Sequence, residues 1–173
     1  WEIGDITVII HNGVYHLFHL IIPNHDYIAH AVSDDGISWK RVNNALFVGN
    51  PGEWDDDMLW TMHVVKSGNI FEMYYTGLQR KDRGIISKIG YASSENLIDW
   101  KKDLKNIYPI EPMGVYYETY KTNPRTWLSF RDPYHFDYNG DSYLLVATRT
   151  INGPVSRRGC VGLVKITNDR MEL

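Results

Sequence analysis

Two aspartates stand at matched distances before two similar turns. Asp132 lies eight residues before Gly140 in DPYHFDYNG, and Asp5 lies eight residues before Gly13 in DITVIIHNG. Two carboxylates that share one cleft push their pKa values apart, which lets them divide the roles of acid and base. Two interpretations stay open at this level. Either the pair does chemistry in a common pocket, or both aspartates form turns and cap strands.

The elements that position these aspartates are short runs of alternating polar and apolar residues. VIIHNGVYHLFHL, MHVVKSGNIFEMYYTG and YHFDYNGDSYLLVATR each place two strand-like halves around a glycine-containing turn, which is typical of a hairpin. IAHAVSDDGISWK matches IGYASSENLIDWK without a gap, so that Ile28 pairs with Ile89 and Trp39 with Trp100. Each matched segment follows a hairpin, and the resulting unit of four short strands has the size of one propeller blade.

These repeats predict an all-β fold, a β-propeller of four-stranded blades. We expect one partial propeller domain over residues 1–173, with about three blades near 6–42, 62–102 and 133–167. Neighbouring repeats bury each other's faces. The first strand of each blade lines the central channel, so Asp5 and Asp132 are expected to converge there. In the middle unit Trp60 or Thr61 takes the same place, because the turn SGN allows either register.

Composition excludes several classes of function. The net charge is −3 with no basic patch, so nucleic acid is not an expected partner. No apolar run is long enough for a membrane span, and Cys160 alone forms no intrachain disulfide. The seven histidines show no metal-binding spacing, so neither a metal nor another cofactor is expected. The chain begins at Trp1 without Met, so we expect the start of the gene product to be missing and read no targeting signal.

Several of these segments resemble one group of enzymes. Asp5 with HNGVYHLFH and HAVSDDGISWKRV resembles the first blade of glycoside hydrolase families 32, 43 and 68. WDDDMLWTMHVV with MYYTG resembles their second blade, and SFRDP resembles their Arg-Asp-Pro motif. The resemblance covers nearly the whole chain. It implies a five-bladed propeller whose axial pocket hydrolyses furanosyl or pentosyl linkages of the arabinan, xylan or fructan type. It also implies an oligo- or polysaccharide partner and favours an extracellular or periplasmic location.

The resemblance assigns roles to individual residues. Asp5 is the expected catalytic carboxylate, a nucleophile in a retaining mechanism or a general base in an inverting one. Asp132 is expected to stabilise the oxocarbenium-like transition state, with Arg131 holding either the substrate or Asp132. Trp60 and Asp57 are expected to face the pocket. For His30, contact with sugar and burial in the core both stay open.

The sequence also departs from the family pattern. IGDITV lacks the Asn and Pro of the fructan-type first motif, and Ile28-Ala29 stand where a Trp-Gly pair usually precedes His-Ala. The family's general acid is a glutamate in a later blade, and after Asp132 only Glu172 remains. We therefore expect the acid beyond residue 173, which would leave this chain inactive alone. Glu118 is a second candidate acid, against the alternative of a solvated loop glutamate.

Other candidates and rivals stay open. The run Asp55–Asp57 is expected to be solvated or to cap turns, although calcium binding is conceivable. A glycoside phosphorylase on the same fold would need a basic phosphate site, which Arg80, Lys81 and Arg83 or Arg157 and Arg158 could supply. A non-catalytic carbohydrate-binding propeller is the rival from another class.

Overall fold

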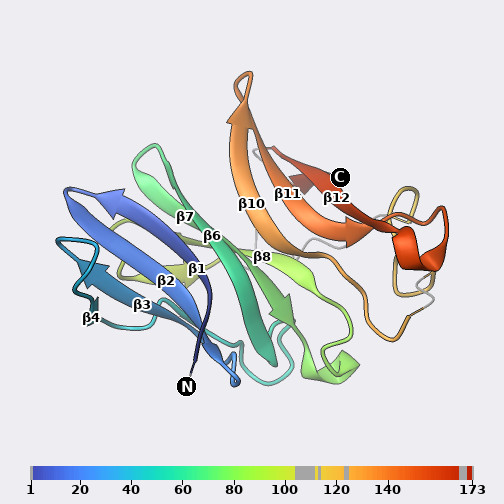
Figure 1. Ribbon diagram of the computed structural model, residues 1–173, viewed down its shortest axis with the longest axis horizontal. Helices are drawn as coiled ribbons and strands as arrows, with labels where there is room; N and C mark the ends of the chain where they lie inside the picture. The colour runs from blue at the N-terminus through green and yellow to red at the C-terminus, as the bar shows by residue number, and fades with distance from the viewer. Residues whose placement is uncertain (1, 104–111, 113, 123–124, 168–170, 173) are drawn as a thin grey trace.

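Three antiparallel sheets lie side by side, with the middle sheet packed between the other two (Figure 1). They are seen in a computed structural model that describes residues 2–103, 112, 114–122, 125–167 and 171–172. Within these residues the only helices are the 3-10 turns η1 (Arg80–Asp82) and η2 (Val155–Arg157), and none could cross a membrane. The prediction of an all-β fold built from four-stranded units is confirmed.

Each sheet is a meander in which strands that follow one another in the chain are hydrogen-bonded neighbours. The first contains β1 (Glu2–His11), β2 (Val14–Ile22), β3 (Tyr27–Ser33) and β4 (Lys40–Arg41), with β5 (Leu46–Phe47) also paired to β3. The second contains β6 (Met58–Ser67), β7 (Ile70–Leu78), β8 (Lys88–Ser94) and β9 (Trp100–Lys102). The third contains β10 (Arg131–Tyr138), β11 (Asp141–Arg149), β12 (Gly159–Ile166) and β13 (Met171–Glu172). We call these sheets blade 1, blade 2 and blade 3.

Two-residue turns of the same sequence close the first hairpins of blades 1 and 3. Asn12 and Gly13 have φ values of 51° and 81°, and Asn139 and Gly140 have φ values of 52° and 85°. Asn and Gly tolerate this left-handed backbone better than other residues, and positive φ at both positions matches the right-handed twist of the strands. The Asn-Gly turns therefore set the register of the two hairpins.

The middle blade is buried on both faces because its side chains alternate between two apolar clusters. Met73 and Tyr75 of β7 point into a cluster shared with blade 1, where they meet Phe18 and Leu20. Tyr74, the residue between them, points into a second cluster that contains Phe130, Leu144 and Val164 of the blade 3 side. Successive side chains of a strand face opposite sides of a sheet, so β7 contributes to both clusters.

The connector before β6 packs Trp54 against strands β7 and β8 of blade 2 and places the charged Asp55 in the interior. The ring of Trp54 lies so close over Gly77 and Gly90 that a Cβ added to either glycine would fall 2.5 Å from it. Asp55, next along the chain, has no exposed surface and accepts hydrogen bonds from Tyr75 Oη at 2.9 Å and Lys102 Nζ at 2.6 Å. The prediction of a solvated position is wrong for Asp55, because Lys102 compensates its charge inside the protein.

Asp56 caps the neighbouring turns, as the alternative prediction for this acidic run expected. Its Oδ1 accepts the backbone N–H of Arg80 at 2.9 Å, and its Oδ2 accepts that of Gly52 at 2.7 Å. These two hydrogen bonds hold the pKa of Asp56 below its ordinary value.

His30 is part of the core of blade 1. Its ring has no exposed surface and stacks on Phe18 with centroids 4.3 Å apart, and its Nε2 shares a hydrogen bond of 3.0 Å with Nδ1 of His16. A side chain without exposed surface does not contact a sugar in solution. The prediction of sugar contact is therefore corrected in favour of the buried alternative, and His30 is left out of the site.

We expect the stability of blade 1 to fall in acid because of this pair. Burial, and then the nearby His16 and His19, lower the pKa of His30 to about 4 from an ordinary 6.5, and burial also lowers the pKa of His16. The unfolded chain therefore binds a proton at pH values where folded His30 does not. The contribution of neutral His30 to the free energy of unfolding is fully present above pH 6.5. It is lost as the pH falls towards 4, which lowers the free energy of unfolding by about 3 kcal/mol.

Urea unfolding of the wild type and of His30→Gln at pH 7.5 and pH 4.5 measures this effect. The loss of unfolding free energy between the two pH values should be smaller in the variant by about 2 kcal/mol or more. An equal loss in both proteins would show that His30 titrates normally in the folded state.

Candidate active site

In each of the three blades, the pairing register between the first and second strands shifts at a similar distance before the hairpin turn. The breaks fall between Ile3 and Ile6 in β1, between Trp60 and Met62 in β6, and between Arg131 and Tyr134 in β10. Asp5, Thr61 and Asp132 lie inside these breaks. β-Bulges are common beside active sites, where they redirect side chains. The structure thereby decides the register of the middle blade, because Thr61 rather than Trp60 is the equivalent of the two aspartates.

The carboxylate of Asp5 reaches across the boundary between blades 1 and 2. The side chain of Asp5 is exposed, and its Oδ2 accepts a hydrogen bond from the Thr61 hydroxyl. Because Thr61 holds one carboxylate oxygen, the orientation of the carboxylate is fixed while the side chain stays open to solvent.

Arg131 and Asp132 form a half-exposed pair at the start of β10. Arg131 Nε lies 3.7 Å from Asp132 Oδ2, with 32% and 36% of the two side chains exposed. The guanidinium of Arg131 also lies over the rings of Trp60, at 5.8 Å from the centroid, and Trp127, at 5.2 Å. Cation–π attraction to two indole rings helps to hold the guanidinium of Arg131 near Asp132.

These contacts join four of the predicted site residues into one group. Asp5 bonds to Thr61, the neighbour of Trp60 in the chain, and Trp60 lies under the Arg131 that pairs with Asp132. Asp5, Trp60, Arg131 and Asp132 thus come from the first strands of three blades and lie at the register breaks of those strands or directly beside them. We call this group with Thr61 the axial cluster.

Asp57 turns to another partner. Its Oδ1 lies 3.8 Å from Arg80 Nε, and its Oδ2 approaches Gly84 in the loop between β7 and β8. Asp57 therefore faces that loop, and no described contact joins it to the axial cluster.

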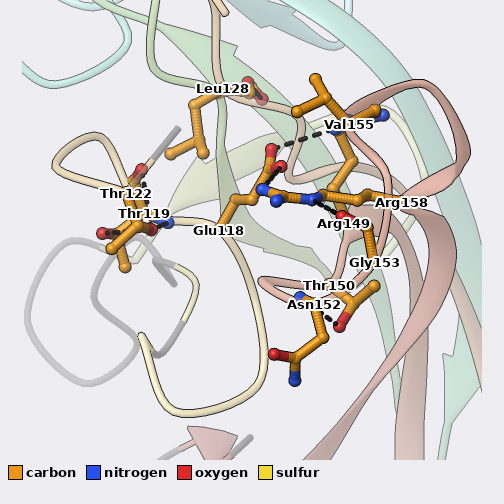
Figure 2. Close-up of polar contacts among 11 residues, drawn as sticks. Glu118, Thr119, Thr122, Leu128, Arg149, Thr150, Asn152, Gly153, Val155 and Arg158 are labelled. Atoms are coloured by element: carbon orange, nitrogen blue, oxygen red, sulfur yellow. Dashed lines mark hydrogen bonds and ion pairs between the residues drawn. The ribbon is translucent and has the colours of Figure 1, made fainter. Parts of the chain in front are cut away.

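Glu118 is neither a solvated loop residue nor an available acid (Figure 2). Only 1% of its side chain is exposed. Its Oε2 accepts a hydrogen bond from Arg149 Nε at 2.9 Å, and its Oε1 accepts one from Arg158 Nη1 at 3.2 Å. Both carboxylate oxygens are thus bonded to cations of blade 3. The alternative prediction of a solvated loop glutamate is wrong, because blade 3 supplies two arginines that compensate the buried charge.

The sequence prediction missed two contributors near the axial cluster. The ring of Trp127 lies 5.2 Å from the guanidinium of Arg131, and the hydroxyl of Thr76 accepts the backbone N–H of Asp132 at 3.0 Å. Trp127 stands only four residues before Arg131, so an aromatic beside the Arg-Asp-Pro motif was a usable signal. Thr76 lies in the MYYTG segment of the resemblance, but its contact with Asp132 of another blade could not be seen in the sequence.

The described residues contain no group of three or more His, Cys, Asp or Glu side chains arranged to hold a metal ion. The side chains of the axial cluster include two carboxylates, one guanidinium and an aromatic ring. Such a set suits a neutral polyhydroxylated ligand, since carboxylates accept hydrogen bonds from hydroxyls and indole faces pack on apolar C–H surfaces.

Comparison with solved structures identifies the fold. Fructan 1-exohydrolase IIa from Cichorium intybus matches with a TM-score of 0.73 and 24% identity, covering 98% of this chain and 31% of that chain. The Bombyx mori GH32 β-fructofuranosidase BmSUC1 matches with a TM-score of 0.67 and 19% identity over 98% of this chain and 34% of its own. The endo-arabinase from Bacteroides thetaiotaomicron has a TM-score of 0.69 and 14% identity, with coverages of 99% and 54%.

These similarities show a shared propeller fold, of which this chain spans about a third to a half of each relative's length. No match was found among curated proteins. The N-terminal domain of glycosyl hydrolases family 32, by contrast, matches residues 6–156, which begin one residue after Asp5 and include the register breaks of blades 2 and 3. The chain therefore belongs to the glycosyl hydrolases family 32 N-terminal domain family.

Proposed function

We propose that the axial cluster is the glycone site of a glycoside hydrolase that cleaves furanosyl or pentosyl linkages. The match to the family 32 model and the similarity to a fructan 1-exohydrolase support the fructan type within this range. The proposal is supported by the placement of Asp5, Thr61 and Asp132 at the register breaks of three blades, with Thr61 bonded to Asp5 and Trp60 under the Arg131 that pairs with Asp132.

In this proposal the two aspartates have different roles. Asp5, with one oxygen held by Thr61, attacks the anomeric carbon and forms a glycosyl ester, which water then hydrolyses with retention. Asp132 accepts hydrogen bonds from sugar hydroxyls that strengthen as positive charge develops on the ring. Trp60 offers its indole face to the ring of the sugar, and Arg131 holds Asp132 in place.

A third group must protonate the leaving oxygen. Glu118 does not suit this role, because it is buried and both of its oxygens accept hydrogen bonds from arginines. We assign the role of acid to a glutamate outside residues 1–173, as the family resemblance implies. The activity experiments below therefore use the full-length protein.

We further propose that the chain is a single partial propeller domain. Blade 1 leaves Ile6, Val8 and Ile10 of β1 exposed on one face, and blade 3 leaves Tyr134, Val161 and Leu163 exposed. Exposed apolar faces of this kind are typical of interaction surfaces, and further blades would cover them. A channel closed in this way would surround the axial cluster.

Hydrolysis of a substrate panel tests the proposed function. The full-length protein is incubated with 1-kestose, inulin, levan, arabinan and xylan, and the released sugars are separated and counted. We expect turnover of one class with water as acceptor. Binding of oligosaccharide without turnover of any substrate would support a non-catalytic carbohydrate-binding propeller instead.

One observation favours glycoside phosphorolysis as a second candidate function. Lys81, Arg83 and Lys88 line a cavity of about 510 Å³ at the loop between β7 and β8, together with Tyr120. Three cations against the single carboxylate of Asp82 suit a phosphate ion. Turnover that requires inorganic phosphate and releases a sugar phosphate would establish this alternative, whereas turnover in phosphate-free buffer would exclude it.

A further inference from the structure

The backbone of Asp132 has an unfavourable conformation. Its φ is 59°, in the left-handed region that residues with a side chain rarely adopt, although Asp tolerates it better than most. Asp132 also precedes Pro133, and the proline ring favours an extended conformation in the residue before it. Two separate preferences therefore oppose the observed backbone, and the surrounding structure must hold it in place.

Thr76 supplies the contact that holds this backbone. The Asp132 N–H donates to Thr76 Oγ1 at 3.0 Å, across the boundary between β10 and β7. Thr76 has no exposed surface, so its hydroxyl is shielded from competing water. The same position, the seventh residue of the second strand, is Leu20 in blade 1 and Ala147 in blade 3. The other two blades thus have an apolar residue at this position, and only blade 2 of the three has a hydroxyl there.

The same part of blade 2 also supports the residue before Asp132. Thr76 pairs with Trp60 in the register of β6 and β7, and the ring of Trp60 lies under the guanidinium of Arg131. Two paired residues of blade 2 therefore support this segment. Trp60 contacts the side chain of Arg131, and Thr76 contacts the backbone of Asp132.

We infer that Thr76 is a positioning residue, whose hydroxyl holds Asp132 in the left-handed conformation that presents its carboxylate beside Arg131. This inference rests on the proposed role of Asp132 in stabilising the transition state. Without the hydroxyl, the Asp132 N–H loses the hydrogen bond that opposes the two backbone preferences, and Asp132 would relax towards an extended conformation. A displacement of about 1 Å at a catalytic carboxylate reduces turnover by up to about 100-fold.

Kinetics of three threonine variants in the full-length protein test this role. Thr76→Val keeps the shape and strand preference of the residue but removes the hydroxyl, and Thr76→Ser keeps the hydroxyl. Thr148→Val is the matched control, because Thr148 is also buried in a second strand while its Oγ1 has no hydrogen-bond partner among the described residues.

We expect Thr76→Val to lower kcat by about 10- to 100-fold with KM changed by less than about threefold, because Asp132 acts mainly in the transition state. Thr76→Ser and Thr148→Val should stay within about threefold of the wild-type kcat. An unchanged kcat in Thr76→Val, or equal losses in Thr76→Val and Thr76→Ser, would overturn the inference.

Amide hydrogen exchange separates this inference from the proposed function. In the ¹⁵N-labelled protein without substrate, the Asp132 amide should exchange at least about 10-fold faster in Thr76→Val than in the wild type and in Thr76→Ser. Equal rates in all three would overturn the inference even if the protein hydrolyses glycosides. A difference in rates in a protein that hydrolyses none would support the Thr76 contact and overturn the proposed function.

Discussion

Asp5→Asn is expected to lower kcat of the full-length protein on the proposed fructan-type substrates by about 1,000-fold or more. The reason is that an amide cannot form the glycosyl ester, and removing a nucleophile commonly costs this much or more. The hydrogen bond from Thr61 survives, because the Asn side chain keeps an acceptor oxygen. Stability should therefore change little, and the loss of activity should be chemical.

Initial rates and thermal melting of Asp5→Asn beside Asp34→Asn measure this effect. Asp34 is an exposed turn residue of blade 1 and should keep wild-type activity when changed to Asn. A smaller variant, Asp5→Gly, should regain turnover when azide is added, because a small anion can take the place of the missing carboxylate. More than a tenth of wild-type activity in Asp5→Asn would contradict the assigned role.

The largest expected change in stability comes from Glu118. Glu118→Gln removes the charge that compensates Arg149 and Arg158. Burial, and then the charges of Arg149 and Arg131, already lower the pKa of the nearby Arg125, and Glu118 opposes this effect. Removing one partner of a buried ion pair leaves the other charges uncompensated, which typically costs about 3–5 kcal/mol. We therefore expect the free energy of unfolding to fall by this amount.

Urea unfolding of Glu118→Gln measures this loss, with Glu95→Gln as the control at an exposed glutamate. The double variant Glu118→Gln with Arg158→Gln should recover part of the loss, because it removes one of the cations left behind. A loss below about 1 kcal/mol in Glu118→Gln would show that the buried ion pairs of Figure 2 do little to fasten the segment around Glu118 onto blade 3.

Local sequence patterns predicted the fold well, because the residues that specify each hairpin are close together in the chain. The Asn-Gly turns and the alternation around them specify hairpins from a few residues, and they also place Asp5 and Asp132 at equal distances from a turn. The choice between Trp60 and Thr61 could not be made in this way. It depends on an extra residue in β6 that shifts the register, and a bulge leaves no trace in composition or period.

Burial of polar residues was the part that sequence reasoning could not predict. Asp55 and Glu118 look like surface residues by type, yet each lies inside the protein, where a cation distant in the chain compensates its charge. The partners, Lys102 and Arg149, are 47 and 31 residues away along the chain. Contacts at such separations arise from the packing of strands and blades, which a single sequence does not reveal.

The position of a bound sugar tests the central claim most directly. A crystal structure of the full-length Asp5→Asn protein with 1-kestose should show one sugar ring with its anomeric carbon about 3–3.5 Å from the side chain of residue 5. The hydroxyls of the same ring should bond to Asp132. A sugar bound away from the axial cluster, with Asp132 left in solvent, would contradict the proposed site.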